Sequence, residues 1–146
     1  MKQLSVAAIE NGSVIDHIKA GQGIRIIELL LLAQHHDKVT LGINLPSKSM
    51  VYKDLIKVEE REISKEEVNQ IAMFAPQATI AIIRDFKVVE KYNVEMPQQI
   101  ERWLKCPNNN CISNHEPLDT KFSVHVNSGY IELECYYCNR SFSHER

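Results

Sequence analysis

Four cysteines in two short pairs constrain this chain more than any other feature of its sequence. Cys106 and Cys111 form a C-x4-C pair, Cys135 and Cys138 form a C-x2-C pair, and 23 residues separate the two pairs. Each pair can sit on a tight turn that points both sulfurs at one position, and two such turns complete a tetrahedron around Zn²⁺. No coordination position then remains for water or substrate, so such a site is structural. We predict one structural zinc ion per chain.

Two other uses of paired cysteines compete with zinc. Two disulfides would require an oxidising compartment, to which nothing in the sequence points. A redox-active C-x2-C pair needs a thioredoxin-like βαβ context, which is absent around Cys135. The segment between the pairs favours zinc, because residues 122–126 and 131–133 alternate between apolar and polar residues on either side of a Ser128-Gly129 turn. This pattern predicts a small hairpin of the kind found in zinc ribbons.

The first part of the chain mixes strand-like and helix-like patterns. Strands are expected at residues 4–8, 14–18, 39–45, 50–58, 79–83 and 86–89, and helices at residues 24–34 and 65–75. The first two runs, 4–8 and 14–18, could form one hairpin or one bent strand. Ser64-Lys65-Glu66-Glu67 is a capping box that begins the second helix, and Pro76 ends it. The order β-α-β-β-α-β predicts a ferredoxin-like α+β fold, with two helices on one face of an antiparallel sheet.

A polar connector containing Pro97 separates this part from the cysteines. We expect one domain at residues 1–97 and a second, zinc-binding and all-β, at residues 98–146. The second domain has 49 residues, which is marginal for a self-sufficient apolar core, so a bound metal would explain its stability.

Charge and apolar patterning exclude several functional classes. Residues 98–146 contain five Lys or Arg and six Asp or Glu, a formal charge of −1, and a zinc ion with four thiolates adds −2. Phosphate binding depends on positive charge, so this balance argues against the alternative of a zinc ribbon that binds nucleic acid. The most apolar run, residues 24–33, is too short to span a membrane. We expect a soluble, cytoplasmic protein that is not an enzyme, since the sequence has no P-loop and no G-x-S-x-G motif.

An ordered set of motifs runs along the whole chain. It comprises Val14-Ile15-Asp16-His17-Ile18, Asn44-Leu45-Pro46-Ser47, Lys53-Asp54-Leu55-Ile56-Lys57, Ala75-Pro76-Gln77-Ala78-Thr79, Cys106-Pro107-Asn108-Asn109-Asn110-Cys111-Ile112-Ser113, Cys135 to Cys138 and Phe142-Ser143-His144. In this order the motifs resemble the regulatory chains of aspartate carbamoyltransferase over essentially the full length.

The resemblance implies a regulatory subunit of pyrimidine biosynthesis whose reaction belongs to separate catalytic chains. The N-terminal domain would bind the nucleotide effectors ATP, CTP and UTP and would pair with a second regulatory chain. The zinc domain would dock onto catalytic chains, so that three regulatory dimers join two catalytic trimers. No membrane and no nucleic acid would be involved.

The resemblance also assigns residues to the effector site. By position, these are Val6, Ala7, Ala8, Ile9, Asp16, His17, Lys57, Ala81, Ile83, Phe86, Val88 and Lys91. Residues 6–9 would recognise the base through backbone groups, Asp16 would face the ribose, and Lys57 and Lys91 would meet ribose and phosphates. Asn108 and Asn110 would project towards a catalytic chain, although asparagines also favour the geometry of such a turn.

Three positions depart from residues found in the family. Ala7 stands where relatives can carry glutamate, Ala81 where they can carry asparagine, and Phe86 where they carry tyrosine. The two alanines contribute no polar side chain, so base discrimination there would depend on backbone contacts.

Overall fold

The computed structural model divides the chain into two compact units, Met1–Glu95 and Met96–Arg146. The structure describes residues 8–30, 36–102, 104–127 and 130–144. In these residues, no helix has the length and apolar character needed to cross a lipid bilayer. Each unit is considered separately below.

The first unit is built on one antiparallel sheet with two helices. Its elements are β1 (Gly12–Lys19), α1 (Gly23–Leu29), β2 (Val39–Ser47), β3 (Val51–Glu59), α2 (Lys65–Phe74), β4 (Thr79–Arg84) and β5 (Lys87–Asn93), and the strand order is β2-β3-β1-β4-β5. The first four strands have the ferredoxin-like arrangement, and β5 adds a fifth strand beside β4. The predicted α+β fold class is confirmed.

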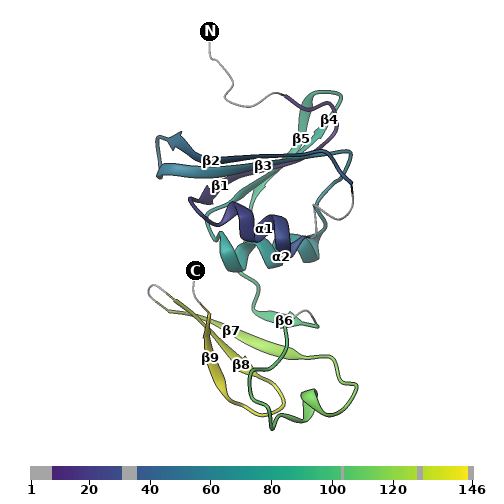
Figure 1. Cartoon of the computed structure of the whole chain (residues 1–146), viewed down its shortest axis with the longest axis vertical. Helices are drawn as coiled ribbons and strands as arrows, with labels where there is room; N and C mark the ends of the chain where they lie inside the picture. The colour runs from purple at the N-terminus through teal and green to yellow at the C-terminus, as the bar shows by residue number, and fades with distance from the viewer. Residues whose placement is uncertain (1–7, 31–35, 103, 128–129, 145–146) are drawn as a thin grey trace. The chain divides into compact units, whose positions relative to one another are not determined.

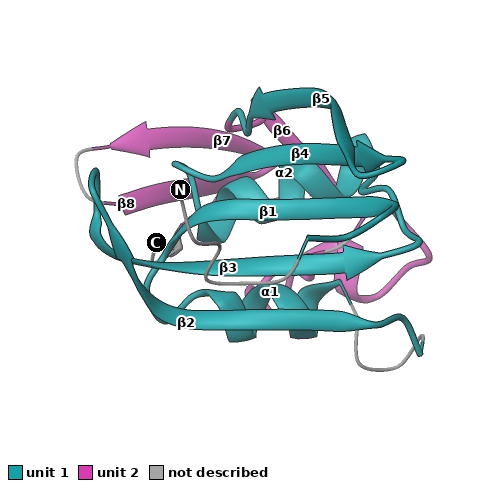
Figure 2. Ribbon diagram, turned by 90° about the horizontal axis from the view of Figure 1, so that it is seen from above, with its two compact units in different colours: residues 1–95 teal, residues 96–146 magenta. Residues whose placement is uncertain are grey.

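Both helices lie against the same face of this sheet (Figures 1 and 2). Successive side chains of a strand point to opposite faces, so alternate residues meet the helices. Ile15 of β1, Ile56 of β3 and Ile80 of β4 pair across the sheet and are fully buried, as are Ile26 of α1 and Ile71 of α2. The residues between them, such as Val14 and Lys57, therefore lie on the opposite face, which we call the open face.

Helix α2 begins as the capping box predicts. The Ser64 hydroxyl accepts a hydrogen bond from the backbone N–H of Glu67 (3.3 Å), and the Glu67 carboxylate accepts one from the N–H of Ser64 (3.1 Å). Helix α1 differs from its prediction, since it begins at Gly23 and its described part ends at Leu29. The rest of the predicted helix, except Leu30, lies outside the described residues.

Asp54 determines the start of α1. This carboxylate is fully buried and accepts three backbone hydrogen bonds, from Gly21 (2.9 Å), Gly23 (3.0 Å) and Asn44 (3.1 Å). A Cβ at Gly23 would lie 3.0 Å from the Asp54 carboxylate and 2.9 Å from Leu41, so the close approach favours glycine. Asp54 thereby joins β3 to the turn before α1 and to the irregular position in β2.

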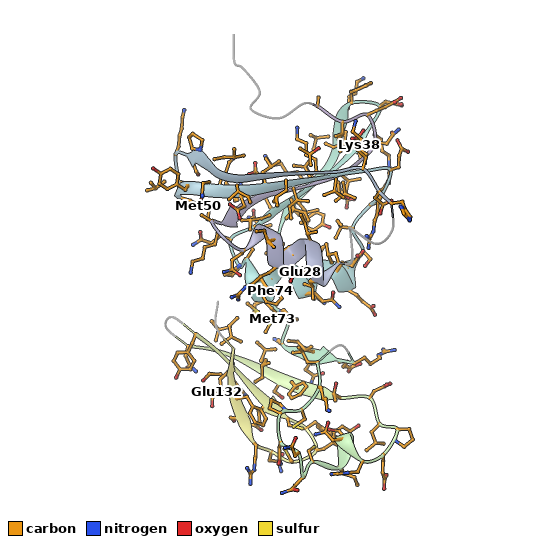
Figure 3. The ribbon with its side chains drawn as sticks, viewed as in Figure 1. Glu28, Lys38, Met50, Met73, Phe74 and Glu132 are labelled. Carbon is orange, nitrogen blue, oxygen red and sulfur yellow. The ribbon has the colours of Figure 1, made fainter. Side chains whose placement is uncertain are left out.

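The beginning of the unit differs from the predicted first strand. Residues 4–7 lie outside the described residues, and Ala8, Ile9 and Glu10 precede β1 without belonging to a strand. The Glu10 carbonyl accepts a hydrogen bond from the N–H of Phe86 (2.9 Å), so this segment runs beside the turn between β4 and β5. At the opposite edge of the sheet, Lys38 lies just before β2, and Met50 lies in the turn between β2 and β3 (Figure 3).

The second unit is a four-stranded antiparallel sheet with the order β6-β7-β8-β9. Its elements are β6 (Gln99–Glu101), the short 3-10 helix η2 (Ile112–Asn114), β7 (Lys121–Asn127), β8 (Tyr130–Cys135) and β9 (Ser141–His144). Strands β7 and β8 form the predicted hairpin, while β6 and β9 extend it at both edges. Ile100, Phe122, Ile131 and Leu133 form its apolar core.

Candidate metal centre and effector face

The sulfurs of Cys106, Cys111, Cys135 and Cys138 converge at one point of the second unit, all within 4.8 Å of one another. The sulfurs of Cys106 and Cys138 are 3.8 Å apart, and those of Cys111 and Cys135 are 3.7 Å apart. With Zn–S bonds of about 2.3 Å, the edge of a regular tetrahedron is about 3.8 Å. The spacing of the thiols therefore fits a tetrahedral zinc ion, and four sulfurs complete its coordination.

The first knuckle, residues 106–111, is held by asparagines. The Asn108 carbonyl accepts from the N–H of Cys111 (2.9 Å), and the Asn108 side-chain oxygen accepts from the N–H of Asn110 (3.1 Å). The amide of Asn114 donates to the carbonyls of Cys106 (3.0 Å) and Asn108 (2.7 Å). Asn108 thus shapes the turn, whereas Asn110 is exposed.

The second knuckle closes the end of β8 onto the start of β9. The N–H of Cys135 donates to the carbonyl of Arg140 (2.9 Å), and the N–H of Asn139 donates to the carbonyl of Cys135 (2.9 Å). Asn139 adopts a left-handed backbone with φ of 61°, which asparagine tolerates well. The Cys135 sulfur accepts from the N–H groups of Tyr137 and Cys138, and the Cys138 sulfur from the N–H of Arg140.

The environment sets different pKa values for the four thiols. Burial raises the pKa of Cys106 to about 12 and also raises the pKa of Cys135. The Ser113 hydroxyl, 3.1 Å from the Cys111 sulfur, lowers the pKa of that thiol. At Cys138 burial opposes ionisation, but hydrogen bonds from Arg140 and Asn108 outweigh it and lower the pKa to about 7. Full ionisation of all four thus needs a bound cation.

The cluster of thiols fits one structural zinc ion, which these four residues hold. Because every coordination position is filled by sulfur, the ion supplies structural stability when bound and offers no position to a substrate. The zinc prediction is confirmed by this geometry and by the metal-binding family match described below.

On the open face of the first unit, one cross-strand row brings predicted effector residues together. Lys57 pairs with Val14, Val14 with Ala81, and Ala81 with Lys91. Directly paired residues project from the same face of a sheet. With strands about 4.8 Å apart, the two lysines emerge about 14 Å from each other. They flank an uncharged floor made by Val14 and Ala81.

Asp16 and His17 lie on one side of this row, two and three residues along β1 from Val14, and Lys53 accompanies them. The Lys53 amine is 2.9 Å from the Asp16 carboxylate, and the backbone N–H of His17 donates to the same carboxylate (2.6 Å). The His17 ring contacts the Thr79 hydroxyl (3.0 Å). Burial would raise the pKa of Asp16, but the hydrogen bonds from Lys53 and His17 lower it overall. Burial lowers the pKa of Lys57, against the attraction of Asp16.

The predicted apolar residues gather on the other side of the row, towards Gly12 of β1. Ile83 pairs with both Gly12 and Val88, and Phe86 bonds to the segment that contains Ile9. Ile9 and Ile83 are buried, whereas Phe86 (65%) and Val88 (57%) are largely exposed. Ala8 is exposed beside Ile9. Val6 and Ala7 lie outside the described residues.

The structure adds three polar residues to which the sequence analysis assigned no role. Lys53 lies four residues before Lys57 on β3, and the period of two along a strand could have placed it on the same face. Ser113 and Asn114 brace the first knuckle through contacts that only the fold reveals. The two units together define a two-domain protein in which a ferredoxin-like domain is joined to a structural zinc-binding domain.

Comparisons with known proteins identify the family. Residues 4–95 match the family model described as the allosteric domain of the aspartate carbamoyltransferase regulatory chain, and residues 98–146 match its metal-binding domain. The chain belongs to the family of aspartate carbamoyltransferase regulatory chains, and it is therefore a non-catalytic subunit.

Curated regulatory chains resemble it over nearly their whole length. Those of Tolumonas auensis and Pyrococcus abyssi are 51% and 50% identical to it, over 99% of this chain and 94% and 96% of their own. The regulatory chain of Psychromonas ingrahamii is 51% identical over 98% of this chain and 94% of its own.

Proposed function

We propose that this chain binds ATP, CTP and UTP on the open face of its first unit and that its zinc unit docks onto catalytic chains of aspartate carbamoyltransferase. In the complete cytoplasmic assembly, three dimers of this chain link two catalytic trimers. Effector binding then regulates carbamoyl transfer in pyrimidine biosynthesis. The allosteric and metal-binding family matches support the division of roles between residues 1–97 and 98–146.

The row on the open face is the observation that carries the effector site. Lys57 and Lys91 stand on either side of Val14 and Ala81, so a ligand lying across the row can meet a cation at each end. Lysine suits phosphate groups because its amine is a mobile point charge with three donors. Asp16 and His17 lie on one side of the row, where a carboxylate can accept hydrogen bonds from ribose hydroxyls. Ile9, Ile83, Phe86 and Val88 would border the base and sugar on the other side.

The docking role follows from the exposed part of the first knuckle. Asn110 points its side chain to solvent while the zinc ligands and Asn114 fix the backbone beneath it. A catalytic chain would therefore meet a rigid loop whose order depends on the metal, because zinc binding to such a unit is folding free energy.

Regulation requires that an effector bind the two states of the assembly with different affinities. Coupling between distinct sites typically amounts to about 1–3 kcal/mol. An effector needs to change the relative stability of two quaternary states by only this amount, and the zinc unit would carry that preference to the catalytic trimers.

The effector site is tested by titrating the zinc-loaded chain with ATP and CTP in a calorimeter. Replacing Lys57 or Lys91 with Gln removes a charge-assisted hydrogen bond, which is worth about 1.5–3 kcal/mol, so each affinity should fall by about tenfold or more. Lys48→Gln makes the same charge change in an exposed turn and should leave both affinities unchanged. Equal affinities in the Lys57, Lys91 and Lys48 variants would show that the open face is not the effector site.

The assembly is tested by native mass spectrometry of the chain mixed with catalytic trimers from the same source. A complex of two trimers and three regulatory dimers should form with zinc and disappear when a chelator removes it. A zinc-loaded chain that binds no trimer would contradict the docking role and leave the metal site intact.

A further inference from the structure

A cavity of about 340 Å³ lies beside the first knuckle of the second unit. This is within the size range of pockets that take ligand groups. Its lining residues include Arg102, Leu104, Lys105, Ser113, Asn114 and Leu118. None of them is a zinc ligand, and none belongs to the predicted sites.

The cavity concentrates positive charge in a negatively charged unit. Arg102 and Lys105 are two of the five Lys or Arg in residues 98–146, and Asp119 is the one acidic residue in the lining. Lys105 makes no ion pair with any residue that the structure describes. Arg102 has a loose contact with its exposed neighbour Glu101 at 3.8 Å, which contributes little. Both cations can therefore pair with an incoming anion.

The backbone at Arg102 is held in an uncommon conformation. Its φ is 76°, in the left-handed region that a long L side chain seldom adopts. Its N–H donates to the carbonyl of Thr120 (2.9 Å), and the Thr120 hydroxyl donates to the carbonyl of Leu104. These two bonds tie Arg102 and Leu104 to Thr120 in the opposite wall. A strained backbone kept in place by its surroundings is typical of binding sites.

The other lining residues indicate what kind of anion fits. Leu104 and Leu118 present apolar surface beside the two cations, which suits a ligand with an apolar stem and an anionic tip. A glutamate or aspartate side chain has both parts, whereas inorganic phosphate has no apolar part. The guanidinium of Arg102 also matches a carboxylate in a two-bond geometry.

The cavity is continuous with the first knuckle. Ser113, in its wall, contacts the sulfur of Cys111, and Asn114 donates to the carbonyls of Cys106 and Asn108. A protein that docks on the first knuckle would therefore lie near the wall of the cavity, and one of its side chains could enter.

We propose that this cavity receives an acidic side chain of the catalytic chain, which pairs with Arg102 and Lys105. The proposal rests on the proposed function, because it assumes that the zinc unit docks onto catalytic chains. It adds the cavity, its two cations and the chemical class of the partner residue.

Zero-length cross-linking of the assembled holoenzyme tests the contact directly. A carbodiimide joins a lysine amine to a carboxylate within contact distance, forming an amide bond while the carbodiimide takes up the water that is lost. Mass spectrometry should find Lys105 joined to a Glu or Asp of the catalytic chain. Lys105→Arg keeps the charge and should still assemble, but it should lose this cross-link. A Lys105 that cross-links only within its own chain, for example to Asp119, would overturn the proposal.

Charge reversal tests the energetic role. Arg102→Glu and Lys105→Glu should each weaken association with catalytic trimers by about tenfold or more, through like-charge repulsion at the interface. Lys121→Glu makes the same change in the same unit outside the cavity lining and should have a much smaller effect. Zinc content and the circular dichroism of each variant report folding, and Arg102→Gln and Lys105→Gln give the milder loss of charge.

The possible results distinguish the docking role of the zinc unit from the role of the cavity. If the original chain binds trimers and all the cavity variants bind them with unchanged affinity, the cavity does not contact the catalytic chain, and the docking role of the zinc unit remains. No trimer binding by the original chain would refute both. A third result would assign the cavity to a free anion instead. In that case millimolar inorganic phosphate shifts the amide resonances of Arg102 and Lys105 in the zinc-loaded chain, and the variants have no effect on assembly.

Discussion

Asp54→Asn is expected to destabilise the first unit strongly. The carboxylate accepts hydrogen bonds from three backbone N–H groups, with one oxygen facing Gly21 and Gly23 and the other facing Asn44. An asparagine has only one acceptor oxygen. In its better orientation this oxygen keeps the two glycine bonds, and the NH₂ group then opposes the N–H of Asn44.

The magnitude follows from these three bonds. One charge-assisted bond worth about 1.5–3 kcal/mol is lost, and each of the two glycine bonds weakens by about 1 kcal/mol when the acceptor becomes neutral. The expected loss is about 3–5 kcal/mol, a large fraction of the 5–15 kcal/mol that is typical of a domain. At an m-value of about 2 kcal/mol/M, the urea midpoint of this unit should fall by about 2 M.

Hydrogen exchange of the zinc-loaded full chain in increasing urea measures this loss, since peptides from residues 8–95 report the first unit separately. Asp85→Asn is the matched control, because Asp85 is exposed in the turn between β4 and β5 and should change stability by less than about 0.5 kcal/mol. If Asp54→Asn and Asp85→Asn differed by less than 0.5 kcal/mol, the anchoring role of Asp54 would be wrong.

Two further predictions concern the metal and the open face. Removal of zinc with a chelator should abolish hydrogen-exchange protection in residues 96–146 while residues 8–95 keep theirs, and full protection in both units after complete removal would contradict a structural metal. The lowered pKa of Asp16 means that its carboxylate stabilises the folded state above the ordinary pKa near 3.8 and that this contribution is lost as pH falls through the lowered value. Asp16→Asn should therefore show a smaller loss of protection in β1 and β3 than the original chain when the pH falls from about 5 to 2. An identical acid response in both chains would show that the pair with Lys53 contributes nothing.

The sequence predicted best those features that depend on local pattern. The capping box at Ser64 fixed the start of α2 because both of its hydrogen bonds are made within four residues. The two cysteine pairs predicted the metal centre because each knuckle is itself local. The alternation along β7 and β8 predicted their hairpin for the same reason.

Features that depend on contacts distant in sequence were missed. The segment at Ala8 and Ile9 has strand-like alternation, yet it precedes β1, and its next residue, Glu10, bonds to the distant N–H of Phe86. The short edge strands β6 and β9 have too few residues for a visible period. The partnership of Asp16 with Lys53 depends on a bulge in β1 between Ile15 and Ile18, which no local pattern indicates.

The knuckles of the zinc unit have a consequence for how such a chain can change over evolutionary time. Their sulfurs are oriented largely by backbone N–H groups, as at Cys135, and these donors are present whatever side chains occupy the turn. Exposed knuckle residues such as Asn109 and Tyr136 can then vary without loss of the metal. A lineage can remodel the surface that its partner meets while the scaffold beneath it stays constant, so that regulatory and catalytic chains can diverge together in small steps.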